Sequence, residues 1–348
     1  MVRMTLSAMQ EMLLLALSAD TGITTPTTDS CADATTLFAN LTKTDLPFIN
    51  SQSGSDWGIV WGPAVLSMKN KKGTQTVVNV TYAAQNSNDQ SYAICIAGTD
   101  FDSWYDWLVE DGTVIVERDW KYGNPPGDTK ISEAAHVALE KVQSLVPCDG
   151  LPGAGQTLAA WLSALSGPLT LNVTGHSLGG ALSVLVSLWL QNTLGGSPAI
   201  NCFGYAGPTP GNANFSSYFS QQVPNMTRVW NQYDVVPNAW NASSMKATLA
   251  LYKTAPAGTQ PSGTEAAAWG TVADAMDLYG YTQILPSLAA LPNPQWGPTA
   301  TTTSFFDQVL YEHVAAYLAL TGTPALPSVT AFLAARGPSP GLRPPSPR

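Results

Sequence analysis

The stretch NVTGHSLGGALSVL, residues 172–185, places Ser177 between a β-branched run and a long apolar segment. Gly175 stands two residues before this serine and Gly179 two residues after it. Glycine is selected where φ is positive or where two backbones approach closely, because it has no Cβ atom. The pattern predicts a sharp turn that carries Ser177 from a strand to a helix. The alternative interpretation is an ordinary turn on glycine in which Ser177 only caps the helix.

The sequence on either side of this turn predicts which elements surround it. Three strand-like runs within residues 56–100 are separated by turn-rich segments, as in hairpins. Strands and helices then alternate from about residue 90 onward, with strands at 168–175, 199–208 and 226–237 and helices at 131–146, 178–196 and 307–322. The third of these strands is expected to end near Asp234. The order predicts an α/β fold with a mainly parallel central sheet, helices on both faces and an antiparallel edge.

We expect one catalytic domain over residues 1–335. Residues 100–128 mix tryptophan, tyrosine and charged side chains and are a candidate lid, although aromatic residues at this density also occur in ordinary cores. Residues 242–304 are too long for a plain connection and are interpreted as an insertion over the catalytic face. Residues 336–348 are rich in proline, which predicts a disordered or extended tail.

Composition restricts the class of partner. Charged residues make up only 11% of the chain, and 24 acidic against 15 basic side chains give a formal charge of −9. Such a balance repels phosphate backbones, so nucleic-acid binding is not expected. A neutral or apolar substrate fits better.

The N-terminal segment contains the apolar run Met12–Ala19, interrupted on its N-terminal side by Gln10 and Glu11. The run is short for a signal peptide and far short of a membrane span. We expect a packed N-terminal helix and no transmembrane segment. The composition raises secretion as an expectation without a convincing signal peptide to support it.

Four cysteines allow three pairings, which the sequence does not choose among directly. Cys95 and Cys202 fall in predicted strands on opposite sides of the strand that precedes Ser177, about 9.6 Å apart at two strand spacings. Such a separation is too long for a disulfide. A bridge between Cys31 and Cys148 stays open, and we expect Cys95 and Cys202 to be buried thiols.

A serine nucleophile needs a base to take its proton and an acid to orient that base. The chain has three histidines, at positions 136, 176 and 313. His136 lies in a helix that precedes Ser177, and His176 lies in the turn itself with its side chain expected to point away from the serine. His313 follows Asp234, which gives the order Ser, Asp, His expected of a nucleophile on a parallel sheet.

Four segments, AICIAGTDFDSWYDWL, VTGHSLGGALSVL, RVWNQYDVVP and YEHVAAYL, together resemble the class 3 lipases, an α/β-hydrolase group that includes fungal triacylglycerol lipases. The resemblance covers about residues 50–325. It implies Ser177 as nucleophile, Asp234 as acid and His313 as base. It also implies an oxyanion loop at Gly98 and Thr99, and a lid that includes Trp104 and Trp107.

These residues predict a carboxylic ester hydrolase, with a triacylglycerol lipase favoured, that works through an acyl-enzyme. The backbone N–H groups of Thr99 and Leu178 are expected to face the oxyanion. No cofactor or metal is expected, and the substrate would be a lipid or small ester, reached at an oil–water interface. A carboxylesterase or acyltransferase on the same triad, or a lipid-binding protein that has lost catalysis, stays an alternative.

Overall fold

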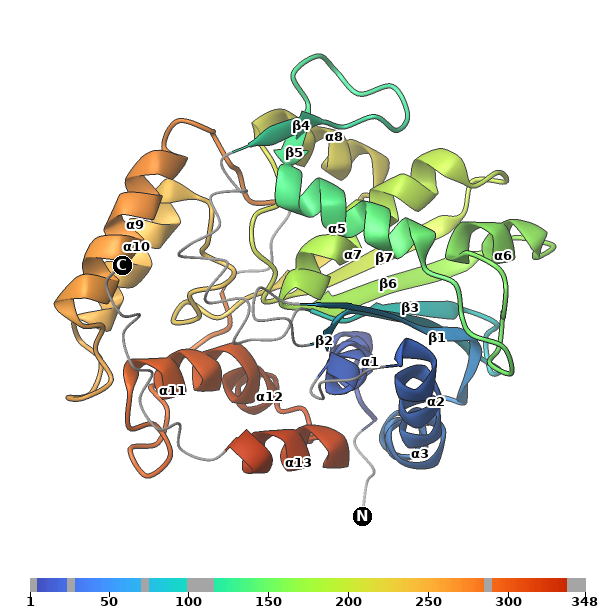
Figure 1. The fold of residues 1–348 in the computed structure, drawn as a ribbon, viewed down its shortest axis with the longest axis horizontal. Coiled ribbons are helices and arrows are strands. Elements are labelled where there is room, and N and C mark those ends of the chain that lie inside the picture. Colours follow the sequence, from blue (N-terminus) through green and yellow to red (C-terminus); the bar gives the residue numbers. More distant parts are fainter. Residues whose placement is uncertain (1–4, 24–28, 70–74, 99–115, 285–289, 337–348) are drawn as a thin grey trace.

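The computed structural model describes residues 5–23, 29–69, 75–98, 116–284 and 290–336. Its centre is a six-stranded sheet in the order β1-β2-β3-β6-β7-β8 (Figure 1). The strands are β1 (Trp57–Lys69), β2 (Gln75–Asn86), β3 (Tyr92–Ile96), β6 (Thr170–His176), β7 (Ala199–Tyr205) and β8 (Asn225–Val229). Strands β1 to β3 pair antiparallel, and β3, β6, β7 and β8 pair parallel. The predicted parallel sheet with an antiparallel edge is therefore confirmed.

Helices cover both faces of this sheet (Figure 1). One apolar core lies between the sheet and α5 (Glu133–Ser144), α6 (Leu158–Ala164), α7 (Leu178–Thr193) and α8 (Ala213–Gln222). The core on the other face involves α1 (Ala8–Asp20), α2 (Ser30–Asn40), α3 (Leu46–Ser53), α12 (Ala316–Thr321) and α13 (Pro327–Arg336). Strands buried on both faces explain the nearly continuous apolar runs in the sequence. The chain thus has the α/β-hydrolase architecture that the sequence predicted.

Smaller elements complete the described chain. The 3-10 helix η1 (Thr21–Ile23) and the π-helix η2 (Leu41–Asp45) follow α1 and α2, and β4 (Glu117–Asp119) pairs antiparallel with β5 (Lys130–Ser132). Helices α9 (Ala242–Tyr252) and α10 (Gly263–Met276) form a third apolar cluster with the turn after β8. Helix α11 (Phe305–Leu310) continues through the π-helix η4 (Tyr311–Ala315) into α12. None of the helices in the described ranges is long and apolar enough to cross a membrane.

Helix α1 confirms the expected packed N-terminal helix, since every residue from Met12 to Ala19 is buried. The helix starts at a capping box in which the side chains of Ser7 and Gln10 satisfy backbone N–H groups. It lies against the middle of the sheet, where the Thr174 hydroxyl of β6 donates to the carbonyl of Met12. The helix ends at Asp20, close to the carboxyl ends of β3 and β6.

The buried thiols expected at Cys95 and Cys202 are confirmed, and the bridge that the sequence left open is present. Cys31 and Cys148 form a disulfide, with Cα atoms 5.7 Å apart, and Cys95 and Cys202 are buried free thiols. Strand β6 lies between the strands that hold the two thiols. Burial raises the pKa of Cys95 to about 12 and that of Cys202 to about 11, so neither is a nucleophile at neutral pH.

Candidate active site

Ser177 is the single residue between β6 and α7, and its backbone has φ 61° and ψ −132°. A non-glycine residue rarely adopts positive φ, because its Cβ then crowds the backbone. Its side chain makes no cap hydrogen bond, so the interpretation of Ser177 as an ordinary helix cap is wrong. The N–H of Ser177 donates to the carbonyl of Tyr205 on β7, at 3.0 Å. The predicted sharp turn is confirmed, and neighbouring strands hold it in place.

The two flanking glycines allow backbones to meet at this turn. A Cβ atom on Gly175 would lie 2.1 Å from the carbonyl oxygen of Gly179, and one on Gly179 would lie 2.2 Å from that of Ile96. No side chain fits at these distances, because a backbone atom rather than a flexible side chain occupies the space. The start of α7 therefore sits directly on β6 and β3.

The loop after β3 also touches the turn. A Cβ atom on Gly98 would lie 2.9 Å from the Cβ of Ser177. Thr99, Trp104 and Trp107, predicted for the oxyanion loop and the lid, lie outside the described residues. Leu178 is the first residue of α7, where backbone N–H groups have no acceptor within the helix.

Asp234 and His313 meet although 79 positions separate them in the sequence. The Nδ1 atom of His313 and the Oδ2 atom of Asp234 are 2.9 Å apart, and both side chains are buried. Asp234 also accepts hydrogen bonds from the Val236 N–H at 3.0 Å and the Tyr317 hydroxyl at 2.9 Å. The carboxylate thus has three donors, which holds it in one orientation toward the imidazole.

One detail of the sequence prediction is wrong at this point. Strand β8 ends at Val229 rather than near Asp234, and Asp234 lies in a turn. The Asn231 side chain accepts from the N–H of Tyr233, which closes the first part of that turn. Five residues beyond the strand, the carboxylate can reach back toward η4.

His313 lies in η4, a π-helical turn between two α-helical segments. Single π-turns often occur at functional sites, where they reorient one side chain. Its ring centroid is 4.6 Å from that of His176, the residue before Ser177. The structure therefore brings His313 to the turn at Ser177. His136 instead lies in α5, where its Nε2 atom is 3.3 Å from the Oε1 atom of Glu140.

Burial sets the charge states of the pair. It lowers the pKa of His313 well below its ordinary value, and a charge on His176 adds to that decrease, so the ring is neutral at neutral pH. Burial raises the pKa of Asp234, and the hydrogen bonds from Val236 and Tyr317 oppose this rise because they stabilise the carboxylate. A neutral imidazole held by a carboxylate is able to accept a proton.

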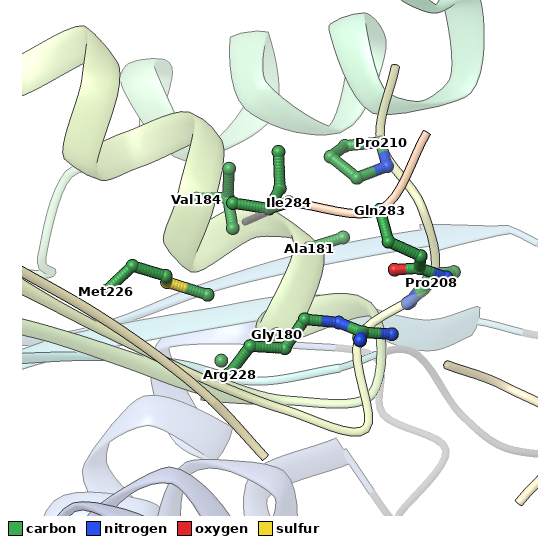
Figure 2. A pocket seen from close by; sticks show the side chains of 11 residues that line it. Gly180, Ala181, Val184, Pro208, Pro210, Met226, Arg228, Gln283 and Ile284 are labelled. Carbon is green, nitrogen blue, oxygen red and sulfur yellow. The ribbon is translucent and has the colours of Figure 1, made fainter. Parts of the chain in front are cut away.

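A water-sized pocket lies beside this site, between the first turns of α7 and strands β7 and β8 (Figure 2). Figure 2 shows the guanidinium of Arg228 beside Gln283 and Pro208. Arg228 and Gln283 both donate to the carbonyl of Pro237, three residues after Asp234. Burial lowers the pKa of Arg228 to about 10, which leaves it cationic at neutral pH. The pair braces the turn that presents Asp234.

Several residues of the site were not predicted from the sequence. Tyr317 lies four residues after His313, so helical spacing could have placed it on the same face. Glu312 accepts from Asn231 and Gln308 inside the protein, and Asp20 reaches the site from the end of α1. Only the fold shows the role of these last two residues. In the described part of the chain, no group of three His, Cys, Asp or Glu side chains is arranged to hold a metal ion.

Comparisons with known proteins identify the family of the chain. Residues 93–243 match the family model described as Lipase (class 3). The crystal structure of M37 lipase matches with 30% sequence identity and a TM-score of 0.80, covering 91% of this chain and 93% of that one. The chain belongs to the class 3 lipases. Phospholipase A(1) DAD1, chloroplastic, of Arabidopsis thaliana is 32% identical over 69 residues. That alignment spans 20% of this class 3 lipase and 15% of the plant protein.

Membership in the family establishes the class of reaction. This class 3 lipase is a serine hydrolase that acts on carboxylic ester bonds, and its substrates are lipid esters. The similarity to M37 lipase extends over nearly the whole of both chains, so it includes the helices on both faces as well as the sheet.

Proposed function

We propose that the chain is a triacylglycerol lipase in which Ser177, His313 and Asp234 form the catalytic triad. The observation that carries this proposal is the 2.9 Å contact between Asp234 and the Nδ1 atom of His313, whose ring lies beside the strained turn at Ser177. With Nδ1–H donated to Asp234, the Nε2 atom of a neutral His313 carries a lone pair. That nitrogen is the base that the serine requires.

In the proposed mechanism, the Ser177 hydroxyl attacks the ester carbonyl and transfers its proton to Nε2 of His313. Asp234 holds the tautomer and stabilises the imidazolium that forms. His313 then gives the proton to the alcohol product as it leaves, which yields an acyl-enzyme. Water, deprotonated by the same histidine, releases the fatty acid and restores the serine.

The developing negative charge on the carbonyl oxygen needs backbone donors. We assign this role to the N–H of Leu178, at the start of α7, and to that of Thr99, which follows Gly98 in the chain. The close approach of Gly98 to Ser177 supports the second assignment. Removing one such donor typically slows an enzyme by roughly 100- to 1000-fold.

The identity of the acyl substrate is tested by a chain-length series. We expect the purified chain to hydrolyse p-nitrophenyl esters from acetate to palmitate, and emulsified triglycerides, with all activity lost in Ser177→Ala. Hydrolysis of tributyrin should rise more than linearly once tributyrin exceeds its solubility, as for a lipase that works at an interface. Activity confined to soluble short esters would instead make it a carboxylesterase.

Three further outcomes are separated in the same assay. The plant relative is named a phospholipase A(1), so phosphatidylcholine should be included as a substrate, with release of the sn-1 fatty acid as the readout. An added alcohol that captured most of the acyl groups as a new ester would indicate an acyltransferase. Binding without turnover would indicate a lipid-binding protein.

A further inference from the structure

The end of helix α1 makes a polar connection to both sides of the candidate active site. One carboxylate oxygen of Asp20 accepts the N–H of Gly98 at 2.7 Å, in the loop after β3. The other oxygen lies 2.8 Å from Nδ1 of His176. The Nε2 atom of His176 in turn lies 2.7 Å from the backbone carbonyl oxygen of His313. Asp20 and His176 therefore join the loop at Gly98 to the backbone of the catalytic base.

The partners of His176 fix where its protons are. A backbone carbonyl carries no proton, so Nε2 of His176 must donate to His313. The proton between Nδ1 and Asp20 stays on the imidazole, because a carboxylic acid is a far stronger acid than an imidazolium. Both ring nitrogens are then protonated. The side chain of Asp20 is 26% exposed, which lets water stabilise its negative charge.

We propose that Asp20 and His176 are positioning residues of the ester hydrolase, forming an aspartate–imidazolium pair that fixes His313 and the loop at Gly98. The proposal rests on the proposed function of His313. Both ring nitrogens of His176 are engaged by Asp20 and His313, so His176 does not compete with His313 as the base for the serine. The ring centroid of His176, the positively charged member of the pair, lies 4.6 Å from that of His313.

The charges around the pair come from four elements in the described part of the chain. Asp20 belongs to α1, Asp234 to the turn after β8, Glu312 and His313 to η4, and Tyr317 to α12. Burial alone would lower the pKa of His176, but Asp20, the carbonyl of His313 and Asp234 together raise it. Burial raises the pKa of Glu312 to about 8, so its ionisation acts on the alkaline side of a pH profile.

The consequence is a prediction for the acid limb of activity. A positive charge beside His313 disfavours a second positive charge, so the base stays neutral to lower pH. Removing the charge on His176 should raise the pKa of His313. We expect the acid limb of kcat/KM to move to higher pH by about one unit.

Three variants separate charge from position. In His176→Gln the amide nitrogen can replace Nε2 as donor to His313, but no charge is present. In His176→Asn the shorter amide can replace Nδ1 toward Asp20, and the bond to His313 is lost. We expect both to shift the acid limb, and His176→Asn alone to lower kcat at alkaline pH as well, by about 10- to 100-fold. His136→Gln, on the outer helix α5, is the matched control and should leave the profile as in the wild type.

Asp20→Asn tests the other member of the pair and is isosteric. The introduced amide can donate to Nδ1 of His176, which would leave that histidine neutral with its proton on Nε2. The chain has only three histidines, so ¹⁵N-labelled imidazole spectra can report each one. At pH 7.5 we expect both nitrogens of His176 to be protonated in the wild type and only Nε2 in Asp20→Asn.

Two results would overturn the proposal. One is a singly protonated His176 in the wild-type spectrum at pH 7.5. The other is an acid limb in folded His176→Gln and Asp20→Asn that coincides with that of the wild type. The spectra need no turnover, so they decide the charge of His176 even if the chain shows no esterase activity. Absence of activity in the wild type would instead contradict the proposed function.

Discussion

The two halves of the candidate site are built by different physics. The half that holds Ser177, the proposed nucleophile, runs from β6 into α7 and is local: one strained residue and two glycines within five positions place Ser177 at the carboxyl end of β6. The half that holds the proposed acid and base joins residues 231–238 to 311–317 and depends on buried polar groups that satisfy one another. Steric fit thus decides the first half, whereas desolvation and hydrogen bonding decide the second. We therefore expect substitutions in the first half to act through steric clashes, and those in the second half to act through lost hydrogen bonds or changed burial of charge.

The largest effect is expected from removing the proposed nucleophile in one half or the proposed base in the other. Ser177→Ala and His313→Ala should each lower kcat by about 10⁵- to 10⁶-fold, and the double variant should be scarcely worse, because triad members act as a unit. Initial rates on p-nitrophenyl butyrate measure this, with circular dichroism as the control for folding. Comparable damage from His136→Ala in a folded protein would contradict the assignment of the base.

The next largest effect should come from a substitution confined to the half that holds Asp234 and His313. Asp234→Asn keeps the size of the side chain but places an amide against Nδ1 of His313, which favours the wrong tautomer. We expect turnover to fall by about 10⁴-fold while the thermal unfolding transition stays cooperative. Near-normal activity would mean that another carboxylate orients the base.

Substitutions in the half from β6 into α7 should act by displacing the backbone. Gly175→Ala forces a methyl group against the carbonyl of Gly179, so the start of α7 must move away from β6. We expect a loss of about 3 kcal/mol in the free energy of unfolding and about 100-fold in kcat. Gly195→Ala, where an added Cβ meets open space after α7, is the matched control and should change stability by less than about 0.5 kcal/mol. Equal behaviour of the two variants in urea unfolding would contradict the steric account.

The smallest effect on catalysis is expected at a buried carboxyl that lacks the close hydrogen-bond donors of Asp234. Asp45, at the end of η2, is fully buried, and neither of its oxygens has a close hydrogen-bond partner among the described residues. Burial raises its pKa from 3.8 to about 6, and the nearby Ser328 hydroxyl opposes this only in part. Between pH 3.8 and about pH 6, Asp45 loses its proton in the unfolded chain but keeps it in the folded chain. Rising pH therefore lowers the free energy of unfolding by up to about 3 kcal/mol.

Asp45→Asn cannot ionise and should not show this loss. In urea unfolding, the free energy of unfolding of the variant relative to that of the wild type should therefore be greater at pH 7 than at pH 4. Asp149→Asn, at an exposed position in the loop after α5, is the control. Parallel pH profiles for wild type and Asp45→Asn would show that Asp45 is ionised in the folded chain. The catalytic rate should not differ between them at the same pH.

The local sequence predicts those features that neighbours in the chain determine. The turn at Ser177, the flanking strands, the buried α1 and the separation of Cys95 from Cys202 follow from periodicity and from glycine spacing. The order of the residues predicts Asp234 as acid and His313 as base, and these roles stay a prediction; the strand before Asp234 was expected to run five residues further than β8 does. Residues NQYD have strand-like neighbours, but the chain turns there because the Asn231 side chain accepts the N–H of Tyr233 and the Asn231 carbonyl accepts that of Asp234.

The amino-acid sequence alone predicts the order of elements, the strained turn and a serine ester hydrolase that resembles the class 3 lipases. The contacts of Asp234 with Tyr317, and of Asp20 with Gly98 and His176, are visible only in the folded chain. This difference follows from the range of the forces. Backbone sterics and hydrophobic periodicity act over a few residues and leave a pattern in the chain. Hydrogen bonds between buried polar groups act over about 3 Å in space, at sequence separations that no local pattern records.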